Sequence, residues 1–427
     1  MPTNLTRNQM IIVGIIFVVV VAGVLVFMGV LPGLQSNTAT QAPNVSLTAV
    51  GPLSSSAFND MAQSYEQSHG NVKISYTQIS EDNYESVLTD ALASGNGPDI
   101  FMIKNSWLSK HANKIYPVPS AQYSLAQMQD TQTGFPTVVV QDFVSSGNIY
   151  ALPLYIDTLA MFYNKDTLDA KSIATLPRTW TDFENLIPKI REINSQNQLS
   201  KPAAAIGGSS QSIDKSSDLL KLIFMQYGNP TISSDGEIRF GINAADPFNF
   251  YVQFANPASQ YYTWSDSLDN SLTNFSSGKT AMIFNYASAI SEIKSQNQNL
   301  SYGISFMPQI DKNNTVNQAS YWGLTVSKQS KNPAWAWDFI ATALTNPTIA
   351  DAYAQAIKEC PALRPLIAKY LNDPNWGVFA SQALTARDWP QPDDNIVSQT
   401  FSYAINSTLT GKLTSSQSLE YIRNNIR

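Results

Sequence analysis

Asp157 is the residue whose surroundings most need a chemical explanation. It stands in an apolar segment, shortly before the run 159–163, in which every residue is apolar or aromatic. Such a run is typical of a strand that is buried on both faces. A carboxylate in these surroundings is costly unless something hydrogen-bonds it. The partner is either a backbone group or a polar ligand in a cleft beside the strand, and the local chemistry favours neither.

A second group of candidates lies in the segment 260–266, which holds two tyrosines, Trp264 and Asp266 between turn-like neighbours. Aromatic residues at helical spacing are usually core, whereas rings in a loop are a better indication of binding. Asp157 and Asp266 could also be the two carboxylates of a glycoside hydrolase. The low charged fraction of 14% and the lack of a recognisable acid/base motif argue against an enzyme.

The composition of the 427 residues narrows the classes of protein. The length favours two or three domains, and a net charge of −6 without a basic cluster argues against a nucleic-acid partner. One cysteine and two histidines leave little for a metal site, and we expect neither a metal nor a cofactor. Cys360 cannot form an internal disulfide and is expected to be a buried small hydrophobe. His69 and His111 lie in polar segments, so we expect both to be exposed.

Residues 10–31 contain no charged residue and are mostly apolar. A segment of about 22 apolar residues can span a bilayer as a helix, whereas the apolar core of a cleaved signal peptide is shorter. Arg7 precedes the segment and no Lys or Arg follows before Lys73, which favours a cytoplasmic location for residues 1–9. We therefore predict a single-pass cell-membrane protein that is anchored in the lipid bilayer through residues 10–31. A linker follows at 32–44, and the remaining chain lies on the extracytoplasmic side.

The elements that would position the candidate residues begin after the linker. Strands are predicted at 45–51, 72–79 and 99–103, with helices at 54–66 and 81–94 between them. This order implies a parallel sheet with right-handed crossovers. Ligands bind at the carboxyl ends of the strands in such sheets, so residues 104–107, including Trp107, lie at the rim of a candidate site.

Further elements of both kinds follow, which indicates an α/β fold. Helices are predicted near 179–191, 214–227, 247–254 and 333–344, and strands at 281–284, 302–308 and 321–326. Tyr286 lies just beyond the first of these strands. Trp322 lies in the last of them.

Several short motifs occur in a fixed order along the chain. They are 97–101, Pro153, Tyr155, Asp157-Thr158, 163–165, 278–282, Pro308, 322–324 and 326–328. In this order they resemble family 1 of the extracellular solute-binding proteins, the maltose-binding-like receptors of ABC importers. The resemblance covers residues 45–345 well and the C-terminal part loosely.

The resemblance implies a two-lobe, type II periplasmic-binding-protein-like α/β fold. Each lobe would be a mostly parallel sheet flanked by helices, with lobe 1 at 45–155 and 303–345 and lobe 2 at 156–302 and 346–427. It implies a monomeric binding protein, not an enzyme, that captures a carbohydrate between the lobes and delivers it to an ABC transporter permease. A glycoside-active enzyme and a surface carbohydrate-binding adhesin without a transport role are the alternatives.

A saccharide presents an apolar face of C–H groups and a ring of hydroxyls. Aromatic rings cover the first, and Asp, Asn and Arg hydrogen-bond the second. Members of the family often place an arginine and an aromatic residue in the C-terminal part, which points to Arg364 and Trp389. Few acidic residues among the candidates disfavour a polyamine ligand. The predicted ligand-binding residues are Trp107, Tyr155, Asp157, Trp264, Asp266, Tyr286, Trp322, Arg364 and Trp389.

Overall fold

The computed structural model describes residues 44–196, 198–232, 238–389, 391 and 393–426. The chain divides into two compact units, Met1–Asn44 and Val45–Arg427. The predicted cytoplasmic segment 1–9, the membrane anchor 10–31 and the linker up to residue 43 lie outside the described residues. Within the described part, no helix is both long enough and apolar enough to cross a bilayer.

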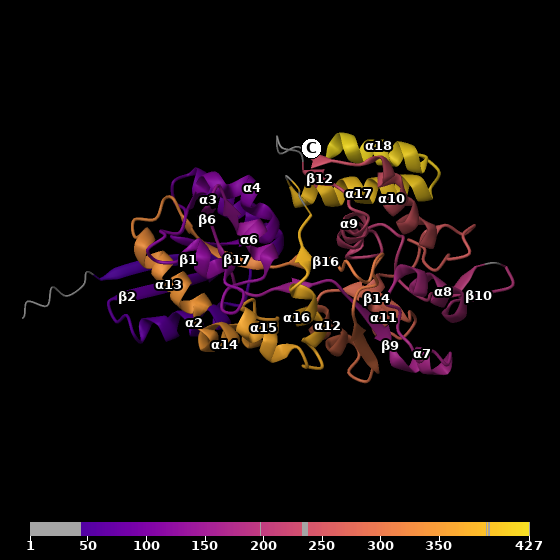
Figure 1. Ribbon diagram of the computed structural model, residues 1–427, viewed down its shortest axis with the longest axis horizontal. Coiled ribbons are helices and arrows are strands. Elements are labelled where there is room, and N and C mark those ends of the chain that lie inside the picture. The colour runs from indigo at the N-terminus through magenta and orange to yellow at the C-terminus, as the bar shows by residue number, and fades with distance from the viewer. Residues whose placement is uncertain (1–43, 197, 233–237, 390, 392, 427) are drawn as a thin grey trace, which may run out of the picture. The chain divides into compact units, whose positions relative to one another are not determined.

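The first lobe is built on a sheet whose strands lie in the order β2-β1-β3-β17-β4. β1 (Val45–Gly51) pairs in parallel with β2 (Val72–Gln78) and β3 (Ile100–Lys104), and α2 (Ser55–Glu66) and α3 (Glu81–Ala93) connect them (Figure 1). The predicted β-α-β-α-β order is therefore confirmed. β17 (Trp322–Ser327) comes from far along the chain and lies antiparallel to β3.

Local signals fix where the first-lobe elements begin and end. The side chain of Ser54 accepts a hydrogen bond from the backbone N–H of Ala57 and so caps the start of α2. Gly95 follows α3 with a φ of +77°, the left-handed conformation that ends many helices and that glycine adopts without strain. Since β1, β2 and β3 are parallel, the chain leaves all three at the same edge of the sheet.

The second lobe contains a three-stranded sheet with β9 (Ala160–Asn164) at its centre. β14 (Met282–Asn285) and β15 (Tyr302–Ser305) flank β9, and both run antiparallel to it. The expectation of a mostly parallel sheet in this lobe is therefore wrong. The apolar run of β9 reports burial on both faces, and a central strand between helices is buried in this way whatever the direction of its neighbours.

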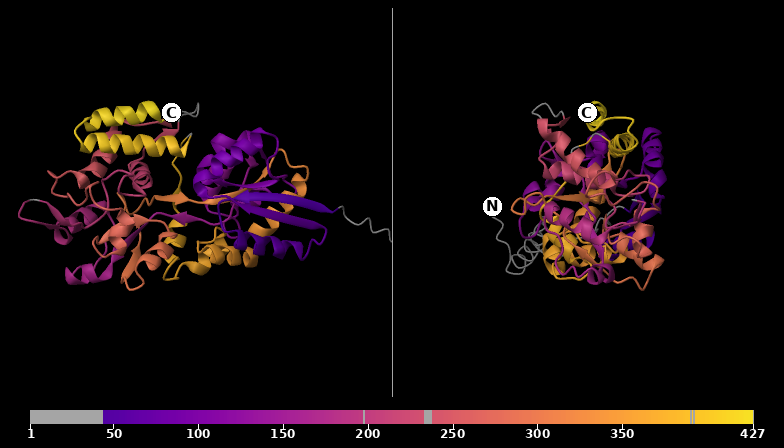
Figure 2. Two further views of the ribbon diagram at one scale, coloured as in Figure 1. Left: turned by 180° about the vertical axis from the view of Figure 1, so that it is seen from behind. Right: turned by 90° about the vertical axis from the view of Figure 1, so that its right-hand side faces the viewer.

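Helices make up most of the second lobe. They include α8 (Trp180–Ile190), α9 (Ser216–Gln226), α10 (Ala245–Val252), α17 (Asp394–Leu409) and α18 (Ser415–Asn425). α17 packs on α9 and on α18, and α18 packs on α10. Figure 2 shows the α17–α18 pair in yellow as two helices side by side. The C-terminal helices therefore hold the start of α9, which belongs to the site described below, against the lobe.

Three short strands connect the lobes and form one sheet in the order β18-β16-β8. β8 (Asp157–Thr158) is antiparallel to β16 (Asn317–Ser320), and β16 is parallel to β18 (Ala386–Arg387). The chain enters the second lobe through β8, returns through β16 into β17, and enters the second lobe again through β18 into α17. Figure 1 shows β16 between the two sets of elements. We call β18-β16-β8 the hinge sheet.

One segment packs differently from the predicted lobe boundaries. α14 (Pro347–Ile357) follows α13 (Pro333–Thr345) and packs on α2 in the first lobe, although residues 346–427 were assigned to the second. The reason is its apolar face, because Ala350 and Tyr353 join the buried core that also contains Phe58 of α2. β15 also departs from the prediction, since Gly303, Ile304 and Ser305 pair with β9 in the second-lobe sheet although residues 303–345 were assigned to the first lobe. The remaining lobe boundaries stay a prediction.

Further elements complete the two lobes. They are α4 (Leu108–His111), β4 (Ile115–Tyr116), α5 (Leu125–Gln129), α6 (Thr137–Phe143), β5 (Val144–Ser145), β6 (Asn148–Ile149), β7 (Leu152–Pro153), α7 (Lys165–Ala170), β10 (Glu192–Ile193), β11 (Leu199–Lys201), β12 (Thr231–Ile232), β13 (Ile238–Arg239), α11 (Ser271–Ser276), α12 (Ala289–Gln296), α15 (Arg364–Tyr370) and α16 (Gly377–Ala383).

Candidate functional site

A cavity of about 410 Å³ lies at the carboxyl ends of the first-lobe strands and is lined by residues of both lobes. Leu53, Glu81 and Lys104 line it from the first lobe, and they end or closely follow β1, β2 and β3. This is the position that the rule for open parallel sheets predicts for a ligand. The volume lies within the usual range for small-molecule pockets. We call this cavity the cleft.

Four of the nine predicted residues line the cleft: Tyr155, Asp157, Tyr286 and Trp322. The ring of Trp322 packs edge-to-face against Trp107, with 5.2 Å between the ring centroids. Lys104 Nζ lies 5.3 Å from the centroid of the Trp322 ring. Trp107 is buried and is not among the residues that line the cleft, so it supports Trp322 from behind.

The sequence left open whether Asp157 is paired with a backbone group or lies beside a cleft, and the structure shows both. Its carboxylate accepts hydrogen bonds from the backbone N–H groups of Thr158, at 2.7 Å, and Ala287, at 2.8 Å. It also lines the cleft, although its side chain is almost fully buried. Burial raises the pKa of Asp157 to about 7, against the opposing effect of the hydrogen bonds to its carboxyl group.

Glu359 lines the cleft beside Asp157 and was not predicted from the sequence. Burial and the neighbouring carboxylate of Asp157 raise its pKa well above the usual range for a glutamate. Lys358 ends α14 in the left-handed conformation, with a φ of +61°, and turns the chain so that Glu359 reaches the hinge sheet. A left-handed lysine carries no sequence signal, so nothing in the primary structure marks Glu359.

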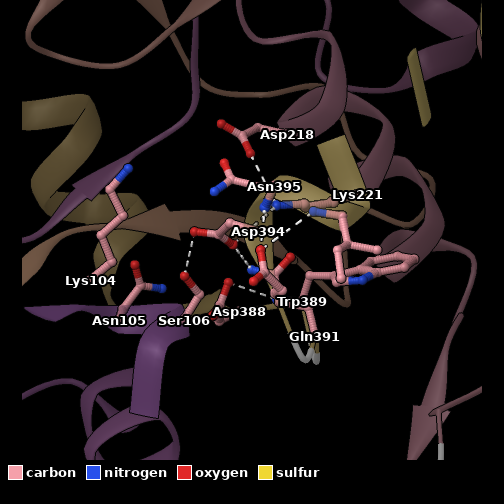
Figure 3. A network of polar contacts seen from close by, with 12 residues as sticks. Lys104, Asn105, Ser106, Asp218, Lys221, Asp388, Trp389, Gln391, Asp394 and Asn395 are labelled. Carbon is pink, nitrogen blue, oxygen red and sulfur yellow. Dashed lines mark hydrogen bonds and ion pairs between the residues drawn. The ribbon is translucent and has the colours of Figure 1, made fainter. Parts of the chain in front are cut away.

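The opposite wall of the cleft carries a second group of carboxylates, and these surround a buried lysine. Lys221 Nζ of α9 lies 3.5 Å from Asp218 Oδ1 and 3.9 Å from Asp394 Oδ1 (Figure 3). Burial alone would lower the pKa of Lys221, but the carboxylates of Asp218, Asp394 and Asp388 together raise it. Burial raises the pKa of Asp388 to about 7, and Lys221 opposes that shift. We call Asp218, Lys221, Asp388 and Asp394 the lysine cluster.

Direct contacts join the two lobes next to the lysine cluster. Ser106 Oγ donates a hydrogen bond of 2.6 Å to Asp394 Oδ2, and Gln391 also donates to Asp394 (Figure 3). Lys110 Nζ lies 2.6 Å from both Asp393 Oδ2 and Glu85 Oε1. The start of α17 is thus tied to the first lobe through residues that follow β3.

A larger cavity of about 860 Å³ adjoins the cleft and shares Asn105, Ser106, Asp388 and Gln391 with it. Trp389, one of the predicted residues, lines this second cavity and not the cleft. Its ring is 1% exposed and packs edge-to-face against Phe224 and Phe401, with centroid distances of 5.5 and 5.7 Å. Trp389 is therefore mainly a core residue of the second lobe.

Besides Trp107, three further predicted residues line neither cavity. Trp264 is completely buried, and its Nε1–H donates to Ser212 Oγ at 2.9 Å. Asp266 accepts hydrogen bonds from the hydroxyls of Ser209 and Ser212, both at 2.6 Å. Arg364 Nε donates to the carbonyl of Phe135 in the first lobe at 3.0 Å. Each has a local packing or hydrogen-bonding role, which explains its residue type without a ligand.

The geometry also bears on the enzymatic alternative and on the titratable residues. Asp157 lines the cleft and Asp266 does not, so the two carboxylates do not flank a common substrate bond.

His111 is 1% exposed and lies 3.2 Å from Glu85, so the expectation that it is exposed is wrong. Cys360 is buried, as expected, and burial raises the pKa of its thiol. The described residues contain no group of His, Cys, Asp and Glu that could hold a metal ion.

Two α/β lobes that are joined by a three-stranded hinge sheet, with a cleft where they meet, define the class of bilobal solute-binding proteins. The family described as bacterial extracellular solute-binding protein matches residues 51–349, and the chain belongs to this family. Its members are binding proteins of ABC transporters and not enzymes, in agreement with the sequence analysis.

Individual relatives and solved structures agree with this assignment. The chain is 21% identical over 322 residues to the maltotriose-binding protein of Pyrococcus abyssi (strain GE5 / Orsay), a match that spans 74% of this chain and only 65% of that relative. It is 24% identical over 388 residues to the galactooligosaccharide-binding protein of Bacillus subtilis (strain 168), covering 86% and 85% of the two chains. The cyclic alpha-maltosyl-1,6-maltose binding protein from Arthrobacter globiformis has a TM-score of 0.74 at 15% identity, over 90% of this chain and 98% of that one. At that identity the structural likeness shows the fold.

Proposed function

We propose that the chain is a membrane-anchored, extracytoplasmic solute-binding protein that captures a carbohydrate in the cleft and delivers it to an ABC transporter permease. The observation that carries this proposal is the lining of the cleft. Tyr155, Tyr286 and Trp322 share it with carboxyl and amide groups from both lobes. Aromatic rings cover the C–H face of a sugar, while carboxylates and amides hydrogen-bond its hydroxyls. The names of the Pyrococcus and Bacillus relatives, which refer to maltotriose and galactooligosaccharide, add support.

The hinge sheet supports capture by closure of the two lobes. A ligand that contacts both lobes stabilises the closed arrangement by the difference between its affinities for the closed and open states. Glu81 and Lys104 line the cleft from the first lobe, and Asp218 and Tyr286 line it from the second. A ligand in the cleft can therefore contact both lobes at once.

Thermal-shift screening tests the carbohydrate assignment. The full chain is measured in a polyoxyethylene detergent, which has no sugar head group, against a panel of mono- and oligosaccharides. A saccharide at a hundred times its dissociation constant stabilises the protein by about 2.7 kcal/mol. Trp322→Ala should abolish this shift. Trp376→Phe is the matched control, because Trp376 packs on Tyr370 and does not line the cleft. Stabilisation by a solute of another class, with none by any saccharide, would refute the assignment.

Fractionation tests the membrane anchor. We expect the full chain to sediment with membranes and to resist extraction at alkaline pH, because residues 10–31 form an apolar segment of spanning length. A chain that lacks residues 1–43 should appear in the soluble fraction. Recovery of the full chain in the soluble fraction would contradict the anchor without affecting the carbohydrate assignment.

The transport role is separable from an adhesin role. Deleting the gene for a solute-binding protein of an importer abolishes uptake of its sugar at concentrations far below the affinity of the permease alone. If the chain binds a saccharide and its loss leaves uptake of that saccharide unchanged, the adhesin alternative is favoured. Release of reducing sugar from a bound oligosaccharide would instead favour the glycosidase alternative.

A further inference from the structure

The cleft is more acidic than the predicted site residues indicated. Seven carboxyl groups and three lysines are among its lining residues. The predicted residues included few acidic ones and so disfavoured a polyamine ligand, whereas the carboxyl groups of the described lining can bind a cation. The question is then which of these carboxyl groups lack a cation of the protein itself.

Most of the acidic side chains in the cleft have a partner. Glu81 pairs with Lys104 at 2.9 Å, and Asp218 and Asp394 flank Lys221. Asp214 accepts a hydrogen bond from Asn270 Nδ2 at 2.5 Å. These groups are compensated by charges or donors that belong to the chain.

Asp157 and Glu359 are two adjacent carboxyl groups, and no lysine or arginine among the described residues forms an ion pair with either. Asp388 forms no ion pair with them either, but it accepts hydrogen bonds from the backbone N–H of Trp389 and from Gln318, and Lys221 opposes the rise of its pKa. Glu359 is 8% exposed, and its Oε2 atom is buried and has no hydrogen-bond partner in the described part of the chain. The polar neighbour on its other side is the carboxyl group of Asp157. A buried acceptor without a donor is costly, and two adjacent carboxylates are more so.

We propose that the Asp157–Glu359 pair is the subsite for an ammonium group, and that the ligand is a saccharide with at least one free amino group. This inference rests on the proposed function, because it adds one charged group to a ligand that is otherwise a carbohydrate. An ammonium group carries three donors and a positive charge. It can donate to Glu359 Oε2 and balance the charge of the pair, while the backbone N–H groups of Thr158 and Ala287 keep their hydrogen bonds to Asp157.

The aromatic lining favours an amino sugar over an aliphatic polyamine. Tyr155 and Tyr286 lie within the electrostatic reach of Asp157, and both line the cleft together with Trp322. These rings suit the C–H face of a pyranose that carries the amino group. Tyr286 also donates to Asp218 Oδ2 at 3.1 Å, which fixes the position of its ring.

The surroundings of the pair predict how affinity depends on pH. The titratable groups that interact with the pair are Tyr155, Tyr286 and Cys360. Glu81 and Tyr353 lie near Tyr155, and Lys215 Nζ lies 5.6 Å from the centroid of the Tyr286 ring. Burial raises the pKa values of the phenols and the thiol, so these stay neutral, and Glu81 is paired with Lys104. Binding of an ammonium group should therefore displace a proton that the pair holds near pH 6. Affinity for an amino saccharide should rise as the pH rises from 5 to 7, whereas affinity for a neutral saccharide should not.

Titration calorimetry on the full chain, in polyoxyethylene detergent, tests the inference with sets of three matched ligands. Each set contains an amino saccharide, its N-acetyl derivative and the analogue with a hydroxyl in place of the nitrogen, for example chitosan disaccharide, diacetylchitobiose and cellobiose. We expect the amino member of the recognised set to bind at least tenfold more tightly than the other two. Glu359→Gln should remove this preference, so that the amino member binds no more tightly than the hydroxyl analogue. Glu184→Gln, which alters a carboxyl group that accepts from Gln253 and does not line the cleft, should keep the preference.

The outcomes separate the inference from the proposed function. If neutral members bind as tightly as amino members, the ammonium subsite is refuted and the carbohydrate assignment stands. If no saccharide binds but spermidine does, both are refuted. If Glu359→Gln fails to fold, the release of protons when the unmodified protein binds ligand tests the ammonium subsite instead. Titrations at pH 6 in buffers of different ionisation enthalpy should show release of about one proton with the amino member and none with the hydroxyl analogue. Absence of proton release with a tightly bound amino saccharide would refute the subsite.

Discussion

Two groups of carboxyls line the cleft, one half-buried around a lysine and one buried at the hinge sheet, and they differ in how their charge is compensated. In the lysine cluster, Lys221 lies among Asp218, Asp388 and Asp394, and the chain supplies its own cation. The Asp157–Glu359 pair at the hinge sheet has backbone donors on Asp157 and no cation from the described residues. The comparison indicates that the lysine cluster is part of the structure of the second lobe, whereas the pair is suited to a positive group from outside.

Removing the cation of the lysine cluster should have the largest effect. Lys221→Met leaves the half-buried carboxylates of Asp218 and Asp394 without a counter-charge. We expect a loss below the roughly 3–5 kcal/mol that breaking a fully buried pair costs, because water screens these carboxylates in part. Chemical denaturation at pH 7 measures the loss. Lys73→Met is the matched control, because the Lys73–Glu66 pair has an exposed lysine and should change stability by about 1 kcal/mol or less. Equal effects of the two variants would show that Lys221 has no special role.

The pH dependence of stability should distinguish the two groups next. The pKa of Asp157 is raised from 3.8 to about 7, and that of Glu359 is raised as well, so the folded state holds protons that the unfolded state releases. This contribution to stability is complete below about pH 4 and is lost as the pH rises towards 7 and beyond. Denaturation of the saccharide-free protein from pH 4.5 to 7.5 should therefore show a decline in stability that is smaller in Glu359→Gln.

Asp388 also contributes to this decline in stability, and its contribution has to be distinguished from that of the Asp157–Glu359 pair. Burial also raises the pKa of Asp388 to about 7, so the lysine cluster adds a slope of the same sign. The difference between the unmodified protein and Glu359→Gln cancels this contribution. An unchanged slope in Glu359→Gln would mean that the pair does not share a proton in solution.

A double variant measures how strongly the charge of Lys221 compensates the carboxylate of Asp388. Asp388→Asn keeps an oxygen that can accept from the backbone N–H of Trp389 and from Gln318, and it removes one negative charge. Added to Lys221→Met, it should restore about 1–2 kcal/mol of the lost stability. The same substitution alone should be close to neutral. If the two effects simply add, the carboxylate of Asp388 does not interact with Lys221.

The smallest expected effect concerns the contact between the lobes. Lys110 pairs with Glu85 in its own lobe and with Asp393 in the other, and its side chain is 35% exposed. Asp393→Asn should therefore reduce stability by about 1 kcal/mol or less, and added salt should remove the difference. Denaturation at low and high ionic strength checks this. A larger, salt-independent loss would place the contact in the same category as the lysine cluster.

The sequence identified the half of the site that follows strands. Tyr155, Asp157, Tyr286 and Trp322 lie beside buried apolar runs. Tyr155 and Tyr286 follow β7 and β14, whereas Trp322 begins β17, which is antiparallel to β3, so all of these residues reach the cleft edge. The direction of β14 and β15 could not be read in the same way, because apolar patterning reports burial and not strand direction. The family motifs located the hinge crossings at β8 and β16, which composition alone does not reveal.

The other half of the site could not be predicted for two physical reasons. Asp218, Lys221 and Asp394 lie on amphipathic helices, where alternating charges normally indicate a solvated face. Trp264 was predicted to bind ligand because its ring lies in a loop-like segment. The ring is instead buried, and its Nε1–H donates a hydrogen bond to Ser212 Oγ. Whether a loop residue faces solvent depends on what packs over it, and one sequence does not contain that information.

The location of Asp157 within the hinge sheet has a consequence for the order of events during capture. Asp157 pairs with Ser320 across β8 and β16, so it sits close to the line about which the lobes rotate. Points on a rotation axis move least, and this carboxylate keeps nearly constant surroundings at every opening angle. A solute can contact Asp157 already in the open state, while side chains farther from the axis reach the solute only when the lobes have closed. If the proposed function holds, Asp157 would be the first residue to hold the solute, and the other contacts would form as the lobes close.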